Sequence, residues 1–506
     1  MRRVAAGIAP YFVVFSASAC GLIIEIVASR LLAPTVGVSL FTWTSIIGVV
    51  LAGISIGNYL GGLTADRFPT PKTLGILLLG AGLTSLSVLP LLEIVSRLYD
   101  SLHILPRIVL ITSTLFLVPS VILGMVSPVV IKLRLSDLSR TGNVVGKIYA
   151  VSTAGSIFGV FVTGFALIQW FGTRPILLGV AVFLLLMAIV FGNLWRMRIV
   201  GAAGLVLFAG VAAMGFATDS LQTECQVESN YFCIKVRERE VDGREVRTLA
   251  LDRLIHSYVD LDDPTFFVYG YEKIFADVST MVGHDKPQFS ALYIGGGGYT
   301  MPRFLQTTYP QSRQEVIEID PAVTQVTHEY LGMPRDTAII THNQDARLII
   351  PELEAGRYDI VIGDAFNDVS VPYHLTTMEF NEEVKRLLTD DGIYAVNVVD
   401  KFHSGGFLRA VVTTLRASFP HVYLLADSDN FVEDNRFTFV VAAAMQPFTY
   451  ADVYFASHAQ GRGDPELTVM SQDELDDWLA RKRNILLRDD YVPVDNLLAP
   501  VFLEIP

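Results

Sequence analysis

The sequence predicts a multi-pass α-helical membrane domain followed by an α/β domain with a doubly wound, seven-stranded sheet. Three observations lead to this prediction: the 506 residues are 51% hydrophobic and only 18% charged, long apolar runs fill the first half, and short apolar strands alternate with helical segments in the second. Such alternation is typical of a parallel sheet covered by helices. We expect a transmembrane domain at 1–218, a small β-rich region at 219–285, the α/β domain at 286–450 and a C-terminal tail at 451–506 that packs on it.

Seven apolar stretches in the first half approach the roughly 20 residues that a helix needs to cross a bilayer. They lie at about 10–32, 41–62, 74–95, 107–131, 149–170, 176–194 and 198–217. Their recurrence excludes a signal peptide, and their internal glycines and serines suit close helix contacts in lipid. We therefore expect a multi-pass protein of the cell membrane, with the lipid bilayer as a partner.

Basic residues gather on one side of a seven-crossing arrangement. They are Arg2, Arg3, Arg67, Lys72, Lys132, Arg134, Arg140, Lys147, Arg196 and Arg198. The positive-inside rule makes this side cytoplasmic and leaves the second half of the chain outside, where Cys225 and Cys233 could form a disulfide. A nucleotide-like cofactor, however, is expected inside the cell. The sequence therefore does not decide on which side of the membrane the second half of the chain lies.

Charge and cysteine content limit the partners. The net charge is −13 and sits mostly in the second half, which disfavours a nucleic acid and favours small or cationic partners. The three cysteines cannot build a metal-binding cluster, so we expect no metal site.

The second half begins with strand patterns. A β-hairpin is expected within 219–262, around the turn signal Asp242-Gly243, and a helix is expected from Tyr271 to Val282. The seven strands of the sheet are expected near 289–294, 314–318, 337–342, 359–364, 393–399, 421–426 and 437–443.

A glycine run follows the first strand of this sheet. It consists of Gly295, Gly296, Gly297 and Gly298. Glycine lets the backbone approach a ligand closely, and the helix that follows offers free N–H groups and its positive dipole end. The run therefore predicts a nucleotide-binding turn, although a tight strand-to-helix turn without a ligand is the alternative.

Acids end the next three strands at Glu318, Asp345 and Asp364. The carboxyl ends of parallel strands meet where open α/β sheets bind ligands, so these acids should converge there. Glu318 could accept hydrogen bonds from two ribose hydroxyls. Asp345 could instead cap the helix that begins at Ala346, and the two roles do not exclude each other.

With these residues in place, the second half resembles the spermidine synthase family, aminopropyltransferases with a methyltransferase-like (Rossmann-like) sheet, and especially bacterial proteins in which such a domain follows membrane helices. The resemblance covers roughly 236–443. It implies that Glu318 holds the ribose of decarboxylated S-adenosylmethionine, that Asp345 with Ala346 contacts the adenine, and that Asp364 takes the proton of the attacking amine. A base is needed because an amine that is protonated at neutral pH cannot attack a sulfonium carbon.

The sequence departs from the family at the amine half of the site. Gly298 stands where the family has an aspartate that holds the aminopropyl amino group. His256 replaces a glutamine, and Asn367 replaces an aspartate for which Asp368 could compensate. The resemblance therefore implies a retained nucleoside half and an altered amine half.

Four residues complete the predicted substrate site: His256, Tyr271, Asp368 and His374. His256 and Tyr271 are more often packed residues than ligands. His374 follows the loop after the fourth strand and is equally consistent with an ordinary loop histidine.

The sequence as a whole predicts a membrane-anchored transferase that moves an aminopropyl group from decarboxylated S-adenosylmethionine to a polyamine. The co-substrate, or S-adenosylmethionine itself, would not be tightly bound, and a homodimer is consistent with this sheet. Two alternatives stay open. The glycine at Gly298 favours a methyltransferase that uses S-adenosylmethionine, and the membrane helices allow a polyamine- or nucleoside-binding transporter or sensor without turnover.

Overall fold

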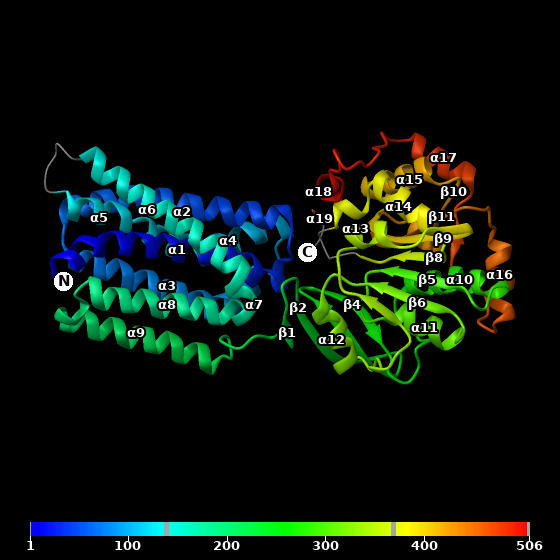
Figure 1. Ribbon diagram of the computed structural model, residues 1–506, viewed down its shortest axis with the longest axis horizontal. Helices are drawn as coiled ribbons and strands as arrows, with labels where there is room; N and C mark the ends of the chain where they lie inside the picture. The colour runs from blue at the N-terminus through cyan, green and yellow to red at the C-terminus, as the bar shows by residue number, and fades with distance from the viewer. Residues whose placement is uncertain (1, 136–140, 366–370, 503–506) are drawn as a thin grey trace. The chain divides into compact units, whose positions relative to one another are not determined.

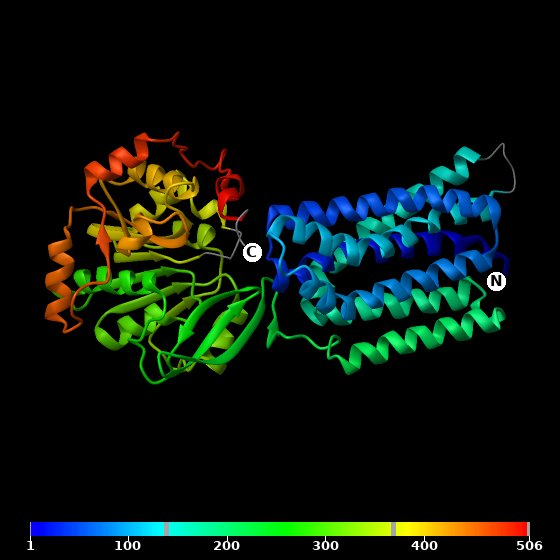
Figure 2. The same ribbon diagram turned by 180° about the vertical axis from the view of Figure 1, so that it is seen from behind.

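The computed structural model describes residues 2–135, 141–365 and 371–502. The chain divides into two compact units, one up to Asn230 and the other from Tyr231. Figures 1 and 2 show them from opposite sides: helices in blue to green make up the first unit, and a sheet flanked by helices, in green to red, makes up the second.

The first unit is helical. Its helices are α1 (Arg2–Val36), α2 (Leu40–Arg67), α3 (Pro71–Leu98), α4 (Ile104–Gly124), α5 (Val126–Arg134), α6 (Thr141–Val162), α7 (Ile168–Phe171), α8 (Thr173–Phe191) and α9 (Arg198–Ala217). Among the described residues, seven helical stretches are long and apolar enough to cross a membrane. Each overlaps one of the seven predicted apolar stretches, although the sixth ends at Phe191, before the predicted end at 194. The short strand β1 (Val227–Glu228) ends this unit.

Small residues allow the helices of the first unit to pack closely. A Cβ atom on Gly57 of α2 would lie 2.2 Å from the carbonyl oxygen of Val121 on α4, and one on Gly155 of α6 would lie 2.2 Å from that of Phe15 on α1. Any side chain at either position would push the two backbones apart. Contacts of this kind are typical of helix packing in lipid.

The second unit opens with three antiparallel strands, β2 (Cys233–Val241), β3 (Arg244–Leu251) and β4 (Leu254–Val259). The turn between β2 and β3 is Asp242-Gly243, and both residues have positive φ, +51° and +75°. Two positive φ values are typical of the tight turns whose twist matches a hairpin. The predicted hairpin is confirmed, and β4 extends it by one strand.

The main sheet has eight strands in the order β12-β10-β11-β9-β8-β5-β6-β7. They are β5 (Ser290–Ile294), β6 (Arg313–Ile317), β7 (Ile340–His342), β8 (Tyr358–Gly363), β9 (Leu388–Lys401), β10 (His421–Ala426), β11 (Arg436–Ala444) and β12 (Thr468–Val469). Strands β7, β6, β5, β8 and β9 are parallel, and β11, β10 and β12 add antiparallel pairs. The main sheet is therefore mixed.

All seven predicted strands are present, but the predicted strand number is wrong by one. The additional strand, β12, pairs with β10 at the edge of the sheet and is only two residues long. Two residues carry no alternation of apolar and polar positions, so periodicity cannot reveal such a strand.

Helices cover both faces of the sheet. They are α10 (Gly270–Asp285), α11 (Thr300–Thr308), α12 (Pro321–Tyr330), α13 (Ala346–Ile349), α14 (Met378–Leu387), α15 (Phe407–Ser418), α16 (Tyr450–Ala459), α17 (Gln472–Ala480), α18 (Val494–Leu497) and α19 (Ala499–Phe502). Helices α14 and α15 pack on β9, while α10 packs on β8 and on α16. Near the C-terminus, Trp478 of α17 stacks on Phe402 with ring centroids 5.2 Å apart.

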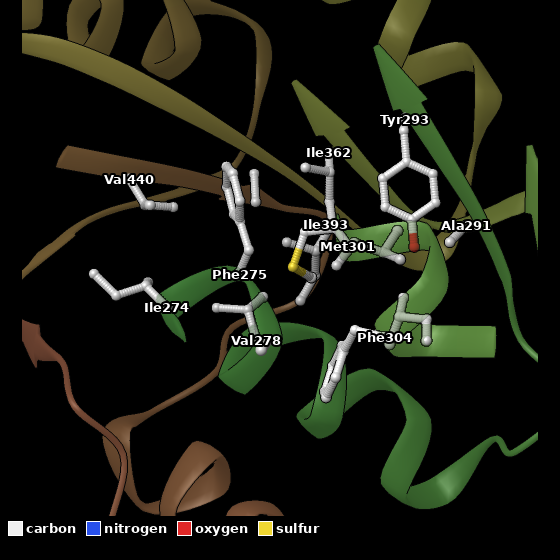
Figure 3. Close-up of a cluster of buried hydrophobic side chains, with 14 of the residues drawn as sticks. Ile274, Phe275, Val278, Ala291, Tyr293, Met301, Phe304, Ile362, Ile393 and Val440 are labelled. Atoms are coloured by element: carbon white, nitrogen blue, oxygen red, sulfur yellow. The ribbon is translucent and has the colours of Figure 1, made fainter. Parts of the chain in front are cut away.

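The core beneath α10 and α11 fixes these helices against the sheet (Figure 3). Phe275 of α10 and Phe304 of α11 are almost completely buried there, together with Tyr293 of β5 and Ile362 of β8. Burial of apolar side chains stabilises a fold by roughly 25 cal/mol per Å². The same packing sets the position of the first turns of both helices, which lie at the candidate site.

The register of the sheet aligns the predicted site residues. Ile294 of β5 lies opposite Ile317 of β6 and Gly363 of β8, and Gly363 lies opposite Val396 of β9. The next residues along these strands are Gly295, Glu318, Asp364 and Asn397. The chain also reverses its direction of winding between β5 and β8, which is where doubly wound sheets bind ligands.

Candidate functional site

The glycine turn after β5 is held between two neighbouring strands. The N–H of Gly295 donates to the carbonyl oxygen of Ile317 at 2.8 Å, and the N–H of Asp364 donates to that of Ile294 at 2.9 Å. Gly295 has φ +101°, and a Cβ atom there would lie 2.3 Å from the carbonyl oxygen of Asp364. Only glycine fits this position, and it brings the turn against the residue that was predicted to be the base.

Glu318 follows β6 and is oriented by backbone groups. Its Oε2 accepts a hydrogen bond from the N–H of Gly296 at 2.8 Å, and its Oε1 accepts one from the N–H of Asp320 at 2.9 Å. The side chain is buried, and burial raises its pKa. A carboxylate accepts about four hydrogen bonds, so the two oxygens keep capacity for ligand hydroxyls.

The second part of the glycine turn packs against β4. Gly297 has φ +50°, and the N–H of Gly298 donates to Ser257 Oγ at 2.8 Å. A Cβ atom on Gly298 would lie 2.7 Å from Ser257 Cβ and 2.8 Å from Val259 Cγ2. The space that a side chain at residue 298 would need is therefore filled by β4.

Tyr299, directly after the glycine turn, is a buried residue that the sequence did not predict to be part of the site. It has φ +56°, which is uncommon for a non-glycine residue, and its side chain is fully buried. Its hydroxyl lies 3.0 Å from Thr324 Oγ1 and 3.2 Å from Thr341 Oγ1. These contacts hold the strained residue at the start of α11.

Asp364 lies just past the end of β8 and is enclosed by two side chains. The Nδ2 of Asn397 donates to its Oδ1 at 2.6 Å, and the hydroxyl of Tyr271 donates to its Oδ2 at 3.4 Å. Burial raises the pKa of Asp364 to about 6. A carboxylate with a pKa near the operating pH is suited to general base catalysis.

A second acid, Glu272 of α10, lies within the same electrostatic environment. Its Oε1 accepts a hydrogen bond from Thr300 Oγ1 at 2.8 Å. Burial raises the pKa of Glu272 to about 8, and the charge of Asp364 adds to the effect. The sequence predicted neither Glu272 nor Asn397 as a site residue.

Asp345 caps α13, as one of the two interpretations predicted. Its Oδ1 accepts a hydrogen bond from the N–H of Arg347 at 2.9 Å, and Ala346 is the first residue of the helix. The Nε2 of His374 lies 3.4 Å from Asp345 Oδ2. The structure thus brings Asp345 and His374 together, and both side chains are partly exposed.

His256 lies on β4 beside Ser257. Its Nε2 is inaccessible to solvent and has no hydrogen-bond partner in the described part of the chain. Burial lowers the pKa of His256 to about 4, so the imidazole is neutral at pH 7. Asp368 falls in the segment 366–370, outside the described residues.

Among residues 2–135, 141–365 and 371–502, no group of three or more His, Cys, Asp or Glu side chains is arranged to hold a metal ion.

Sequence comparison relates the site to known proteins. Residues 271–428 match the family model of the spermine/spermidine synthase domain. A polyamine aminopropyltransferase from Vibrio vulnificus is 38% identical over 108 residues, which are 21% of this chain and 36% of that protein. The human eEF1A lysine and N-terminal methyltransferase is 27% identical over 144 residues, 26% of this chain and 20% of that protein. The chain thus spans about a third or less of the length of these two relatives.

Among solved structures, a probable spermidine synthase from Corynebacterium glutamicum is similar to the chain with a TM-score of 0.45 and 19% identity. The match covers 51% of this chain and 93% of that one.

Proposed function

Because residues 271–428 belong to the spermine/spermidine synthase family, we propose that the chain is a membrane-anchored transferase that moves an aminopropyl group from decarboxylated S-adenosylmethionine to a polyamine. The observation that carries this proposal is Asp364, a buried carboxyl group at the winding switch of the sheet whose pKa is raised to about 6. Glu318, one strand beyond β5, presents the acid that a ribose requires.

The reaction needs a base and orientation more than any other catalytic device. Asp364 takes a proton from the acceptor ammonium group, and the free amine attacks the carbon next to the sulfonium. The new C–N bond forms as the C–S bond breaks. The electron pair of the C–S bond stays on the sulfur atom, so methylthioadenosine is the leaving group. In-line orientation of the two substrates supplies the rest of the rate increase.

The nucleoside half of the proposed site consists of Glu318 for the ribose hydroxyls and Asp345 with Ala346 for the adenine. The glycine turn at 295–297 forms the wall beside the donor chain. His256, Tyr271 and His374 are proposed to line the acceptor side. Of these, Tyr271 contacts Asp364 directly.

Membrane anchoring is part of the proposal and rests on the seven long apolar helices. Extraction of cell membranes with alkaline carbonate should leave the protein in the pellet, and release into the supernatant would contradict anchoring. Protease treatment of intact and of opened cells then determines the side of the second unit. The basic residues favour the outside, and the co-substrate favours the cytoplasm.

The proposed activity is tested on the full chain purified in detergent. Calorimetry with decarboxylated S-adenosylmethionine, S-adenosylmethionine and methylthioadenosine measures binding, and mass spectrometry after addition of putrescine or spermidine identifies products. We expect binding of the decarboxylated donor and a product one aminopropyl group heavier than the acceptor. Binding without product would contradict a transferase and favour a sensor or transporter.

A methyltransferase is the second candidate because Gly298 lacks the carboxylate that the family uses at this position, and because a methyltransferase is among the relatives. This candidate predicts that intact S-adenosylmethionine binds more tightly than the decarboxylated form. Transfer of a methyl group in the same mass-spectrometric assay would replace the leading proposal.

A further inference from the structure

The helices of the first unit surround a polar cavity. It has a volume of about 170 Å³ and lies between α1, α2, α4 and α6, which are labelled in Figure 1, with one further residue from α5. A water molecule takes up about 30 Å³ of the liquid, so the cavity has room for a ligand of several non-hydrogen atoms. Its lining residues lie near the middle of helices that are long enough to cross a membrane. The binding sites of membrane transporters are typically found at this depth.

The wall of this cavity is rich in hydroxyl groups. Five of its residues are serines, namely Ser18, Ser120, Ser127, Ser152 and Ser156. Asn58 of α2 adds a side-chain amide, and the hydroxyls of Ser18 and Ser152 lie 2.7 Å apart. The hydroxyl of Ser120 has no hydrogen-bond partner within the described residues, although Ser120 is only 5% exposed. Polar groups in apolar surroundings are costly unless they are bonded, so a ligand that bonds to them is expected in the cavity.

An acid continues the polar face of α1 beyond the cavity. Ser18 and Gly21 of α1 line the cavity, and Glu25 follows Gly21 by one helical turn, which is about 6 Å along the axis. At about 100° of rotation per residue, Glu25 falls in the middle of the face that carries the lining residues of α1. Glu25 is 9% exposed, and no described residue forms a hydrogen bond or ion pair with it. Such an acid is costly in a membrane helix and usually marks a ligand or ion site.

The basic residues of the first unit do not compensate this acid. Arg30, five residues after Glu25, donates to the carbonyl oxygens of Ser229 and Asn230. None of the described residues that line the cavity is Lys, Arg or His. A ligand in the cavity therefore meets hydroxyl and amide acceptors and the field of one carboxylate. This combination disfavours an anion and favours a cation with several N–H groups.

We propose that the first unit binds a small aliphatic ammonium compound in this cavity, where the serine hydroxyls and Asn58 accept its N–H groups and Glu25 balances its charge. The first unit is then a ligand-binding domain in addition to a membrane anchor. The site lies entirely within the first unit, which ends at Asn230, and is independent of the reaction proposed for the second unit.

Protection of a cysteine tests the proposal on the full chain in detergent. Ser156→Cys places a thiol in the wall of the cavity, in a Cys20→Ala background that removes the free cysteine of α1. Putrescine, which carries two ammonium groups, should slow the modification of this thiol by a small thiosulfonate reagent at least about fivefold, because a bound ligand excludes the reagent. The neutral diol of the same chain length should change the rate less than about twofold, because it lacks the charge that Glu25 attracts.

The comparison of the two ligands decides the outcome. Equal protection by both would overturn the cationic ligand, and protection by neither would show that the cavity holds only water. Thr153→Cys is the control, because this residue is exposed on the same helix and lies outside the wall, so putrescine should not protect it. If Ser156→Cys does not fold, Ser127→Cys provides a thiol in the wall from α5.

The role of the acid is tested by Glu25→Gln, which keeps the size of the side chain and removes its charge. The putrescine concentration for half-protection should rise about tenfold or more. Glu93→Gln is the matched control and should leave this concentration unchanged, because α3 contributes no described residue to the wall. An unchanged value in Glu25→Gln would overturn the proposal. If this variant does not elute as a single species, Ser120→Ala replaces it. That change should raise the concentration about threefold, and an unchanged value would then be decisive against the site.

Discussion

The proposed nucleoside half and the proposed amine half of the site differ in how many of their buried oxygen atoms accept a hydrogen bond from the protein. Both oxygens of Glu318 accept backbone hydrogen bonds, and Asp345 accepts one from the helix that it caps. On the amine side, Glu272 and Asn397 each keep a buried oxygen without a partner in the part of the chain that the structure describes.

This difference indicates two ways of binding. Backbone contacts hold the nucleoside half in one geometry before a ligand arrives, which lowers the entropy lost on binding. In the proposed amine half, burial raises the pKa values of Glu272 and Asp364, and a bound cation would lower them again. Variants of the first half should therefore weaken all nucleosides alike, and variants of the second should discriminate between them or stop the chemistry.

The largest expected effect is that of Asp364→Asn. An amide cannot take the proton of the acceptor, so the rate of aminopropyl transfer should fall by about 10² to 10⁴. The affinity for methylthioadenosine should stay within about threefold, because the nucleoside contacts lie on other strands. The measurement is product formation by mass spectrometry, together with calorimetry.

Asp473→Asn is the matched control for this change, because the same substitution is made on an exposed residue of α17. It should leave the rate unchanged. Activity within about tenfold of wild type in Asp364→Asn would show that the proton leaves by another route.

Glu318→Gln should have the second-largest effect. The new amide places an N–H₂ group against the N–H of Gly296 or of Asp320, so one hydrogen bond is replaced by a donor–donor contact. We expect about a 10- to 100-fold loss of affinity. The loss should be equal for decarboxylated S-adenosylmethionine and methylthioadenosine. A loss restricted to the amine-bearing ligand would contradict the division of the site into two halves.

An aspartate at residue 298 tests whether the glycine turn has room for the carboxylate that the family carries there. In Gly298→Asp, the side chain meets Ser257 and Val259 of β4, so the hairpin must move or the turn must distort. We expect a loss of roughly 1–3 kcal/mol in the free energy of unfolding and no gain in affinity for the decarboxylated donor. Chemical denaturation and calorimetry measure the two quantities. A tighter-binding, equally stable variant would show that β4 leaves room for the family's carboxylate.

The sequence predicted the parts of this site that depend on local patterns. Each apolar run became a strand, and each acid that followed one became a residue at the carboxyl edge of the sheet, because strand ends are set by the chain itself. The sequence also predicted that Asp345 could cap α13, because an aspartate directly before a helix start is a local signal.

Residues that depend on lateral packing were missed. Asn397 faces Asp364 because β9 pairs with β8 in one register, and sequence patterns do not give the register of parallel strands. A polar residue inside the apolar strand 393–399 was the available signal. Glu272 resembles a surface acid in the first turn of a helix, and only the packing of α10 beside α11 buries it.

The smallest expected effect concerns pH. Only the ionised form of Asp364 accepts a proton, so the rate should rise with pH through about 6, the pKa to which burial raises this carboxyl. The hydrogen bond from Asn397 favours the carboxylate and lowers this pKa. Asn397→Ala should therefore move the rising limb of the profile to higher pH, while methylthioadenosine binding stays unchanged.

The pH profile of single-turnover transfer, measured with saturating donor, provides the readout. Asn381→Ala is the matched control: this asparagine is also buried, but it lies on α14 and is not bonded to Asp364. It should leave the limb near pH 6 even if it lowers stability. An unshifted limb in Asn397→Ala would mean that Asp364 is not the group that titrates. A limb near pH 8 instead of 6 would point to Glu272, whose pKa burial raises to about 8.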